Sequence, residues 1–333
     1  MTQAVLGAVV ADVTIGSRIG RAAVLWGLAY GTLPDLDMLA LPWLDGVERL
    51  QWHRGISHSI VGIAAMTPLL AFPIAKWHGV ALARAMLATF LVLATHVVID
   101  VFTAYGTQLL EPFASTRFSV RTMFVIDPLY TLPLLFGVGS AVFAGPRVRR
   151  RCMIAGLVLS TLYAAATGVA KAVVNARFAT AIATAGLPSR DWITLPTPLN
   201  AWYWRCLVLD TEADVVWSAY LALRDDPASI TFTRIERGTA TFQELPDDRA
   251  ATAAVWFTEG YYAVRRDAEL GTVTVGDLRL GDASLGRVPI DQRAPSVFRF
   301  DVSDCGRTMM MRPGDFGDVG AALRFLWTKL VGD

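Results

Sequence analysis

The first half of the chain contains apolar stretches long enough to cross a membrane. A bilayer core needs about 20 consecutive apolar residues in a helix. Two shorter apolar runs, Ala4–Gly16 and Ala22–Leu33, come first and are expected to form a tilted or partly re-entrant hairpin. The stretches that fit a full span are Ser59–Ala75, Val80–Val101, Pro128–Ala144 and Cys152–Val174. The sequence therefore predicts an α-helical multi-pass membrane domain.

Charge divides the chain into two unlike parts. Residues 1–185 carry 14 basic and 8 acidic side chains, whereas residues 186–333 carry 16 basic and 21 acidic ones. We therefore predict a helical transmembrane domain over 1–178 and a soluble, β-rich (α+β) domain over 186–333. The net charge of +1 gives no reason to expect nucleic acid as a partner. The predicted strands are Ile230–Ile235, Ala254–Val264, Thr272–Arg279 and Ser296–Val302.

Apolar residues at helical spacing predict a helix over 317–331. We expect it to pack on its own sheet, with a membrane-surface helix as the alternative. In the same domain, Cys206 and Cys305 could form a disulfide if the domain lies outside the cytoplasm, and two free thiols are the alternative.

Basic residues between the spans predict how the chain crosses the membrane. The densest cluster is Arg147, Arg149, Arg150 and Arg151, and basic loops favour the cytoplasmic side. Alternation of the spans then places the C-terminal domain on the other side. We expect a multi-pass protein of the cell (inner) membrane with an extracytoplasmic C-terminal domain.

Three short polar segments interrupt the most apolar part of the chain: 33–37, 53–59 and 96–100. Ionisable groups in or near a bilayer cost about 2.5–3.5 kcal/mol on insertion scales, so they rarely persist without a partner or a role. His96 and Asp100 are four residues apart and share one helical face. Alone, this pair is explained better by a simple His–Asp hydrogen bond, because partly buried His and Asp usually pair with each other. Alternation of the spans places all three segments on one side of the membrane, which favours a shared site.

Histidine and aspartate in the three segments are good ligands for zinc, manganese or iron. Asp35 and Asp37 follow a Leu-Pro pair, so an extended or turn conformation is expected at Leu33; an N-cap or turn role is their alternative. Ser57 or Ser59 is expected to cap the following helix. The predicted ligands of one or two divalent ions, zinc first and manganese or iron as alternatives, are Asp35, Asp37, His53, His58, His96 and Asp100.

Three other polar residues in the apolar half have more local explanations. Asp127 precedes Pro128 and is expected to cap a helix. Asp12 lies inside an apolar run and needs a donor. Gln3 is expected near the same face as the polar segments.

A bound metal at such a place predicts hydrolysis of an ester or phosphoester by a metal-activated water at the outer membrane interface. Arg54 would steady the developing negative charge, and Asp37 is the second catalytic candidate. The location indicates membrane lipids as partners and a lipid-linked substrate. The alternative is a metal-stabilised membrane scaffold that binds a partner protein; an ion transporter fits less well, because the polar groups cluster at one face.

The chain resembles the family of LexA-binding, inner-membrane-associated hydrolases, which are membrane-bound and metal-dependent. The resemblance implies metal-binding His and Asp residues at the six positions above. Some relatives carry a histidine where this chain has Gln3, so Gln3 is expected to act as a weak or indirect ligand. The matching stretches are MTQAVLGAVVAD (1–12), WGLAYGTLPDLD (26–37), HRGISHS (53–59), HVVIDVFTAYGTQLLEPF (96–113) and FVIDPLYTLPLL (124–135), and, less specifically, FTEGYYAV (257–264), DLRLG (277–281) and FRF (298–300).

Overall fold

The computed structural model describes residues 1–267, 272–280, 285–286, 298–303, 309–313 and 319–331. The chain divides into two compact units, which we describe separately. The first, the helical unit, comprises Met1–Leu41 and Trp52–Thr167; the second, the sheet unit, comprises Pro42–Gln51 and Gly168–Asp333.

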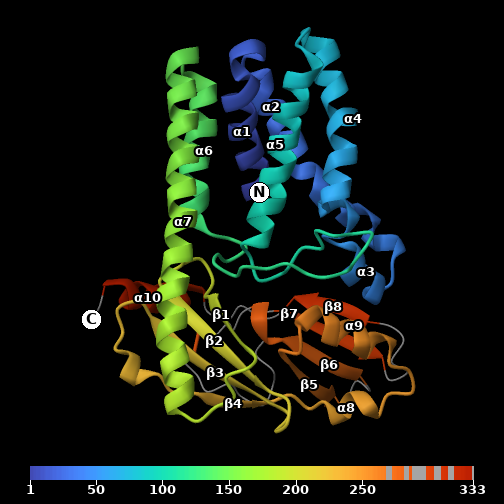
Figure 1. Ribbon diagram of the computed structural model, residues 1–333, viewed down its shortest axis with the longest axis vertical. Helices are drawn as coiled ribbons and strands as arrows, with labels where there is room; N and C mark the ends of the chain where they lie inside the picture. The colour runs from blue at the N-terminus through green and yellow to red at the C-terminus, as the bar shows by residue number, and fades with distance from the viewer. Residues whose placement is uncertain (268–271, 281–284, 287–297, 304–308, 314–318, 332–333) are drawn as a thin grey trace. The chain divides into compact units, whose positions relative to one another are not determined.

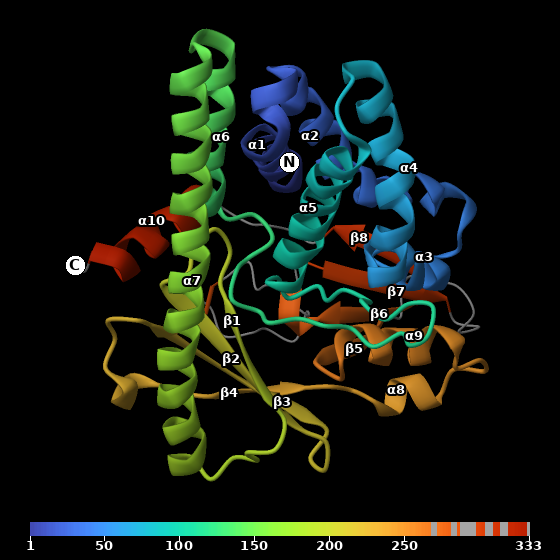
Figure 2. The same ribbon diagram turned by 45° about the horizontal axis from the view of Figure 1, so that its top comes forward.

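The helical unit is a bundle of apolar helices that run alongside one another (Figures 1 and 2). Among the described residues, α4, α5 and α7 are long and apolar enough to cross a membrane, and α6 is a shorter apolar helix. Large apolar side chains such as Phe72, Phe136 and Leu162 are exposed on the unit, as expected for lipid-facing surfaces. The helices are α1 (Thr2–Ile19), α2 (Ala22–Thr32), α4 (Ile60–His78), α5 (Leu82–Val101), α6 (Pro128–Phe143) and α7 (Pro146–Thr184).

Glycines allow α1 and α2 to pack at very short distance. A Cβ on Gly27 would lie 2.3 Å from the carbonyl oxygen of Gly7, and a Cβ on Gly31 would lie 2.6 Å from that of Gln3. Small residues permit such close backbone contact between membrane helices. The predicted hairpin is therefore a pair of tightly packed helices, and α1 is largely buried inside the bundle.

Two 3₁₀ helices and one short α-helix follow α2: η1 (Leu33–Trp43), α3 (Gly46–Trp52) and η2 (Ile56–His58). The prediction of an extended or turn conformation at Leu33 was wrong. Leu33 has φ −58° and ψ −44°, and its N–H binds the carbonyl of Tyr30. This bond joins residues three apart, as in a 3₁₀ helix, so the last turn of α2 is tightened and continues without a break into η1.

The long helix α7 continues past the predicted span, and the boundary between the units falls within it. In the sheet unit, its residues Val174, Phe178 and Ile182 recur every four positions and pack against Trp204 and Val208 of an antiparallel sheet. This sheet has the order β1-β2-β3-β4 and consists of β1 (Trp192–Pro196), β2 (Tyr203–Asp210), β3 (Val215–Ala222) and β4 (Thr233–Glu236).

A second antiparallel sheet has the order β5-β6-β7-β8. The predicted strand Ala254–Val264 was wrong over its first part, because residues through Thr258 belong to α9. The buried residues Ala250, Ala254, Phe257 and Thr258 follow a helical period. The elements are η3 (Pro227–Ser229), α8 (Ala240–Gln243), α9 (Arg249–Thr258), β5 (Tyr262–Asp267), β6 (Thr272–Asp277), η4 (Leu278–Leu280), β7 (Phe298–Ser303), β8 (Met309–Pro313) and α10 (Val319–Val331).

The β-sheet character of the C-terminal region and its final helix agree with the prediction. Cys206 is a buried free thiol, and burial raises its pKa. Cys305 lies outside the described residues.

Candidate metal centre

Four side chains from three segments of the helical unit converge at one end of the bundle. Asp35 comes from η1, His58 from η2, and His96 and Asp100 from α5. One oxygen or nitrogen of each lies within 4.8 Å of the others. The Nε2 atoms of His58 and His96 are 3.2 Å apart; from each of them Asp35 Oδ1 is 3.5 Å away and Asp100 Oδ2 3.3–3.4 Å. These four residues are the core set.

The hydrogen bonds of the two Nδ1 atoms, which point away from the cluster, determine the protonation of the Nε2 atoms that face it. His96 Nδ1 lies 2.7 Å from the carbonyl oxygen of Gly31, which can only accept, so Nδ1 carries the proton. Ser57 Oγ donates its one hydrogen to Asp37 Oδ2 and therefore accepts from His58 Nδ1 at 2.9 Å. Neutral His58 and His96 thus both direct an Nε2 lone pair toward the same point.

Asp100 divides its two oxygens between different partners. Oδ1 accepts from the Gln3 amide at 3.0 Å and lies 2.9 Å from the Arg54 guanidinium. Oδ2 is buried, has no hydrogen-bond donor among the described residues, and faces the two imidazoles. A buried carboxylate oxygen without a donor is costly, and a cation between the four core atoms would satisfy it.

The donor set and its spacing fit a small transition-metal ion. Tetrahedral zinc with bonds of about 2.0–2.1 Å places its ligand atoms about 3.3–3.4 Å apart. Five of the separations in the core set, 3.2–3.5 Å, lie close to this value. Imidazole nitrogens with carboxylate oxygens suit zinc, manganese or iron(II).

The net negative charge of the site also favours a bound cation. Asp35, Asp37 and Asp100 are three carboxylates, and Arg54 supplies one positive charge within hydrogen-bonding distance of Asp100. With neutral imidazoles two negative charges remain, which one divalent ion would cancel. The Asp35 side chain is 29% exposed, whereas those of His58, His96 and Asp100 are buried, so the site is accessible on the Asp35 side.

Asp37 and His53 lie beside the core set. Asp37 accepts from Ser57 and from the Arg54 backbone N–H, and its Oδ1 is 2.9 Å from His53 Nδ1. Burial by itself would raise the pKa of Asp37, but the contact with His53 lowers it below its usual value. The Asp37 carboxylate is therefore ionised at neutral pH.

Arg54 is held in an unusual backbone conformation. Its φ of 58° lies in the left-handed region, which costs a residue with a side chain about 1 kcal/mol or more. The bond from its N–H to Asp37 stabilises this conformation. The buried guanidinium donates to Thr103 Oγ1, pairs with Asp100 and stacks on Tyr105. This arrangement orients Asp100 toward the cluster.

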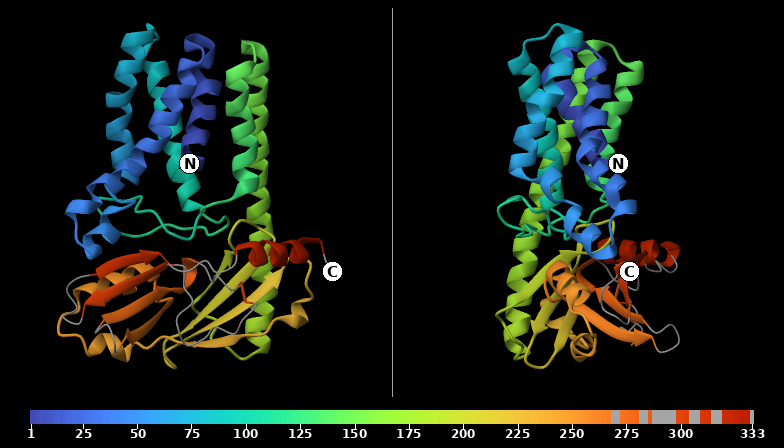
Figure 3. Two further views of the ribbon diagram at one scale, coloured as in Figure 1. Left: turned by 180° about the vertical axis from the view of Figure 1, so that it is seen from behind. Right: turned by 90° about the vertical axis from the view of Figure 1, so that its right-hand side faces the viewer.

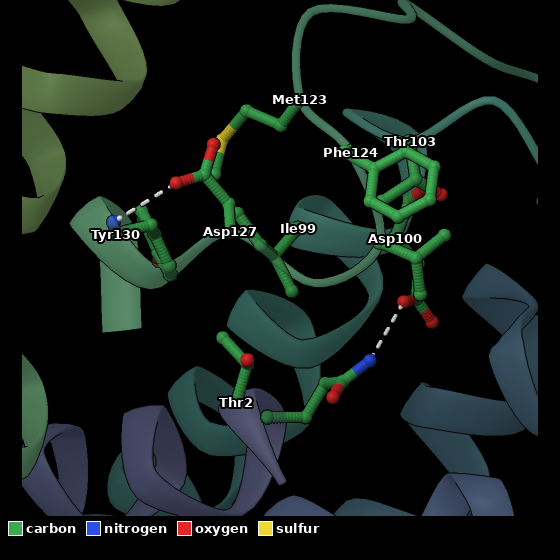
Figure 4. A pocket seen from close by; sticks show the side chains of 10 residues that line it. Thr2, Ile99, Asp100, Thr103, Met123, Phe124, Asp127 and Tyr130 are labelled. Carbon is green, nitrogen blue, oxygen red and sulfur yellow. Dashed lines mark hydrogen bonds between the residues drawn. The ribbon is translucent and has the colours of Figure 1, made fainter. Parts of the chain in front are cut away.

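A small pocket lies on the other side of Asp100, between the start of α1, the end of α5 and the segment before α6 (Figure 4). Asp100 and Thr103 line one side of it and Asp127 and Tyr130 the other. Asp127 caps α6, as predicted, by accepting from the Leu129 N–H, and its Oδ2 accepts from Tyr163. The remaining lining residues are Thr2, Gln3, Ile99, Met123, Phe124 and Val125.

The structure gathers all six predicted ligand residues at one end of the bundle, and four of them form the core set. Gln3 contributes a hydrogen bond to Asp100, and its role as a weak or indirect ligand stays a prediction. Sequence reasoning missed Gly31 and Ser57, which fix the two imidazoles. The spacing of Gly27 and Gly31 was an available signal for close helix packing. Ser59 caps α4 as predicted, accepting from the Gly62 N–H, whereas Ser57 does not.

Fold and site together define a helical membrane protein with a buried cluster of histidine and aspartate. Residues 1–174, more than half of the chain, match the family model described as YdjM inner membrane protein. The chain therefore belongs to the YdjM inner membrane protein family. The family match confirms the predicted resemblance at the level of an inner membrane protein, and it does not extend to the motifs after residue 174.

One curated relative matches part of the chain. The chain is 28% identical over 120 residues to "Uncharacterized protein YfhP" of Bacillus subtilis (strain 168). The match covers 35% of this chain and 36% of the relative, so the chain spans about a third of the length of that protein. No solved structure matches the chain.

Proposed function

We propose that this chain is an integral-membrane, metal-dependent hydrolase that cleaves an ester or phosphoester. The proposal rests on two imidazole nitrogens and two carboxylate oxygens that face one another, and the protons of the neutral rings are held on the far nitrogens by Ser57 and the Gly31 carbonyl. Once bound, a divalent ion supplies Lewis acidity, which lowers the pKa of water and polarises an ester oxygen. Zinc is the first candidate; manganese or iron, which accept more ligands, are the alternatives.

The residues of the chain would have different roles around the ion. Asp35, His58, His96 and Asp100 would hold the ion, and the exposed side of Asp35 would admit water and substrate. Asp37 would orient His58 through Ser57. Arg54 would hold Asp100 and steady negative charge on the substrate, because a guanidinium in a buried site stabilises developing charge more strongly than in water.

We further propose that α4, α5, α6 and α7 are four membrane spans. The metal centre would then lie at the non-cytoplasmic interface, where a lipid-linked substrate could reach it, and residues 186–333 would form an extracytoplasmic domain. A reporter fused after Asp333 tests this orientation. If a reporter that is active only in the cytoplasm is active at this position, the proposed orientation is wrong, and the proposal of a metal centre is unaffected.

A second candidate function is a metal-stabilised membrane scaffold. The observation in its favour is that the core set supplies four protein ligands, three of them buried. Structural zinc sites are closed by four protein ligands, whereas catalytic sites usually keep one position open. The absence of thiolates from the core set argues against a purely structural role, because structural zinc sites are mostly built with cysteine.

Metal content and hydrolysis, measured on the same detergent-purified samples, separate these possibilities. We would compare the wild type with His96→Ala/Asp100→Ala and with Asp12→Leu/Arg149→Met, a control that removes charges elsewhere in the bundle. Mass spectrometry would quantify the metals, and chromogenic carboxylic and phosphate esters and labelled phospholipids would serve as substrates.

The hydrolase proposal predicts near-stoichiometric metal in the wild type and the control, lost in His96→Ala/Asp100→Ala together with hydrolysis. Metal without turnover of any ester would favour the scaffold. Metal absent from all three proteins, purified without chelator, would overturn the metal centre itself.

A further inference from the structure

Helix α10 in the sheet unit carries two apolar faces. Through one face, Phe325 and Leu326 pack against Tyr203 and Tyr220, and the Leu326 carbonyl accepts from the Trp202 indole. This confirms the predicted packing of the helix on its own sheet. The opposite face exposes a second apolar stripe: Leu323 (49% exposed), Trp327 (62%), Leu330 (41%) and Val331 (49%).

The course of helix α7, which continues from the helical unit into the sheet unit, indicates what lies near this stripe. In α7, residues 152–170 contain no charged side chain, and these 19 residues span about 28 Å at 1.5 Å per residue, close to the thickness of a bilayer core. Lys171 is the first charged residue after them. It donates to the Thr194 carbonyl on β1 and lies over the Trp204 ring on β2.

The end of the sheet next to Lys171 is the end that α10 covers. Trp204 pairs with Pro196, and the adjacent Tyr203 pairs with Ala222, so these residues form one end of the β1–β4 sheet. Tyr203 packs against α10 and lies under Lys329. Figure 3 shows α10 across this end of the sheet. The exposed stripe therefore lies at the end of the sheet where α7 leaves its apolar segment.

We propose that the exposed stripe of α10 docks on the surface of the same membrane that α7 crosses. Trp327 is at the centre of the stripe, and tryptophan is enriched at membrane–water interfaces. Between Val319 and Val331 the helix has Arg324 and no acidic residue, which suits anionic lipid headgroups, whereas its Lys329 faces the sheet and pairs with Asp225. The proposal rests on the proposed membrane crossing of α7 and is independent of hydrolysis.

Spin labels on the full chain test this docking. With Cys152, Cys206 and Cys305 replaced by alanine, single cysteines would be introduced by Leu323→Cys on the stripe and Thr328→Cys on the polar side of the same helix. Leu159→Cys on α7 reports the span. Each protein would be reconstituted in vesicles of phosphatidylethanolamine and phosphatidylglycerol, and collisions with oxygen and with a nickel chelate would be measured.

Docking predicts that the label at position 323 favours oxygen over nickel, that the label at 328 favours nickel, and that phosphatidylcholine vesicles weaken the difference. Equal nickel access at 323 and 328, with the label at 159 in lipid, would overturn docking; a water-exposed label at 159 would overturn the span on which it rests. Spin–spin broadening at 323 that dilution with unlabelled protein removes would show instead that a second copy covers the stripe.

A measurement that keeps the native cysteines covers the case in which the cysteine-free background does not fold. Brominated lipids quench tryptophan fluorescence at the membrane surface. Docking predicts that Trp327→Phe loses part of the quenched signal, whereas an unchanged quenched fraction would contradict it.

Discussion

The two ends of the helical unit both bury charge, but they balance it differently. At one end, Arg149 Nε lies 3.1 Å from Asp12 Oδ1, and Arg149 also donates to the Gly16 carbonyl. One cation meets one anion, as expected from the need of Asp12 for a donor. At the other end, three carboxylates and two imidazole lone pairs lie close together, and the Arg54 guanidinium pairs with one of the carboxylates, that of Asp100.

This difference separates a structural ion pair from a site for a ligand. The Asp12–Arg149 pair brings one positive charge to one negative charge and is neutral within the protein, although neither Asp12 oxygen has a hydrogen-bond donor among the described residues. The core set has an excess of electron-pair donors that the described residues do not satisfy, and a buried excess of this kind persists only with a bound cation or bound protons. Charge balance, rather than the presence of charge, therefore distinguishes the two ends.

The largest effect is expected from breaking the balanced pair. Arg149→Met leaves the Asp12 carboxylate buried without a cation, which we expect to cost about 3–5 kcal/mol of unfolding free energy. The double variant Asp12→Leu/Arg149→Met should recover most of this loss, because both charges are gone. Unfolding of the detergent-solubilised proteins by denaturant measures the effect. A double variant as unstable as Arg149→Met would show that the pair is not a simple balanced one.

Metal removal tests the unbalanced end. An ion present at about 100–1,000 times its Kd stabilises a protein by about 2.7–4.1 kcal/mol, so chelation should lower the Tm of the wild type and metal addition should restore it. Asp12→Leu/Arg149→Met should keep this response and His96→Ala/Asp100→Ala should lose it. The prediction fails if the chelator lowers the Tm of the ligand variant by as much as that of the wild type.

The sequence predicted which residues lie close together but not which of them face the centre of the cluster. Alternation of the apolar spans placed three polar segments on one side, and their residues do meet at one end of the bundle. Which of them face the centre depends on ring orientation, and this is set by the Gly31 carbonyl and by Ser57. Partners 65 residues apart, such as Gly31 and His96, have no local sequence signature.

The errors in secondary structure have physical causes as well. Residues 254–258 contain aromatic and β-branched side chains that favoured a strand, but the alanines before them sustain a helix that buries one face. At Leu33, a backbone hydrogen bond to Tyr30 outweighed the restriction imposed by Pro34. The strands β1 to β3 were not predicted.

A smaller effect is expected from Gly31→Ala, which alters the unbalanced end through its backbone. The new Cβ would lie 2.6 Å from the Gln3 carbonyl oxygen, so α1 and α2 must separate, at a cost of about 1–3 kcal/mol. The shift also moves the Gly31 carbonyl from His96 and should weaken metal binding. Gly139→Ala in α6 is the matched control, because no atom from outside its own stretch of helix is found within 4 Å of its new Cβ. Equal metal affinity and stability in both variants would contradict the role of Gly31.

The finest test compares two serines two residues apart. Ser57→Ala removes the acceptor that holds the His58 Nδ1 proton, and loss of such an outer partner weakens metal binding about 10–100-fold. Ser59→Ala removes the cap of α4 and should cost about 1 kcal/mol of stability, with metal affinity unchanged. Metal competition against a chelator and thermal unfolding measure the two quantities.

Ser57→Thr keeps the hydroxyl and should retain most of the metal affinity. If Ser57→Ala binds metal as tightly as Ser59→Ala does, His58 does not need Ser57 to present its Nε2 lone pair. The excess of donors at this end would then depend on the protonation of His58 rather than on the fixed hydrogen bonds around it. If only Ser57→Ala loses metal affinity and only Ser59→Ala loses stability, two serines of the same polar segment have separate roles, one in the metal centre and one in the helix cap.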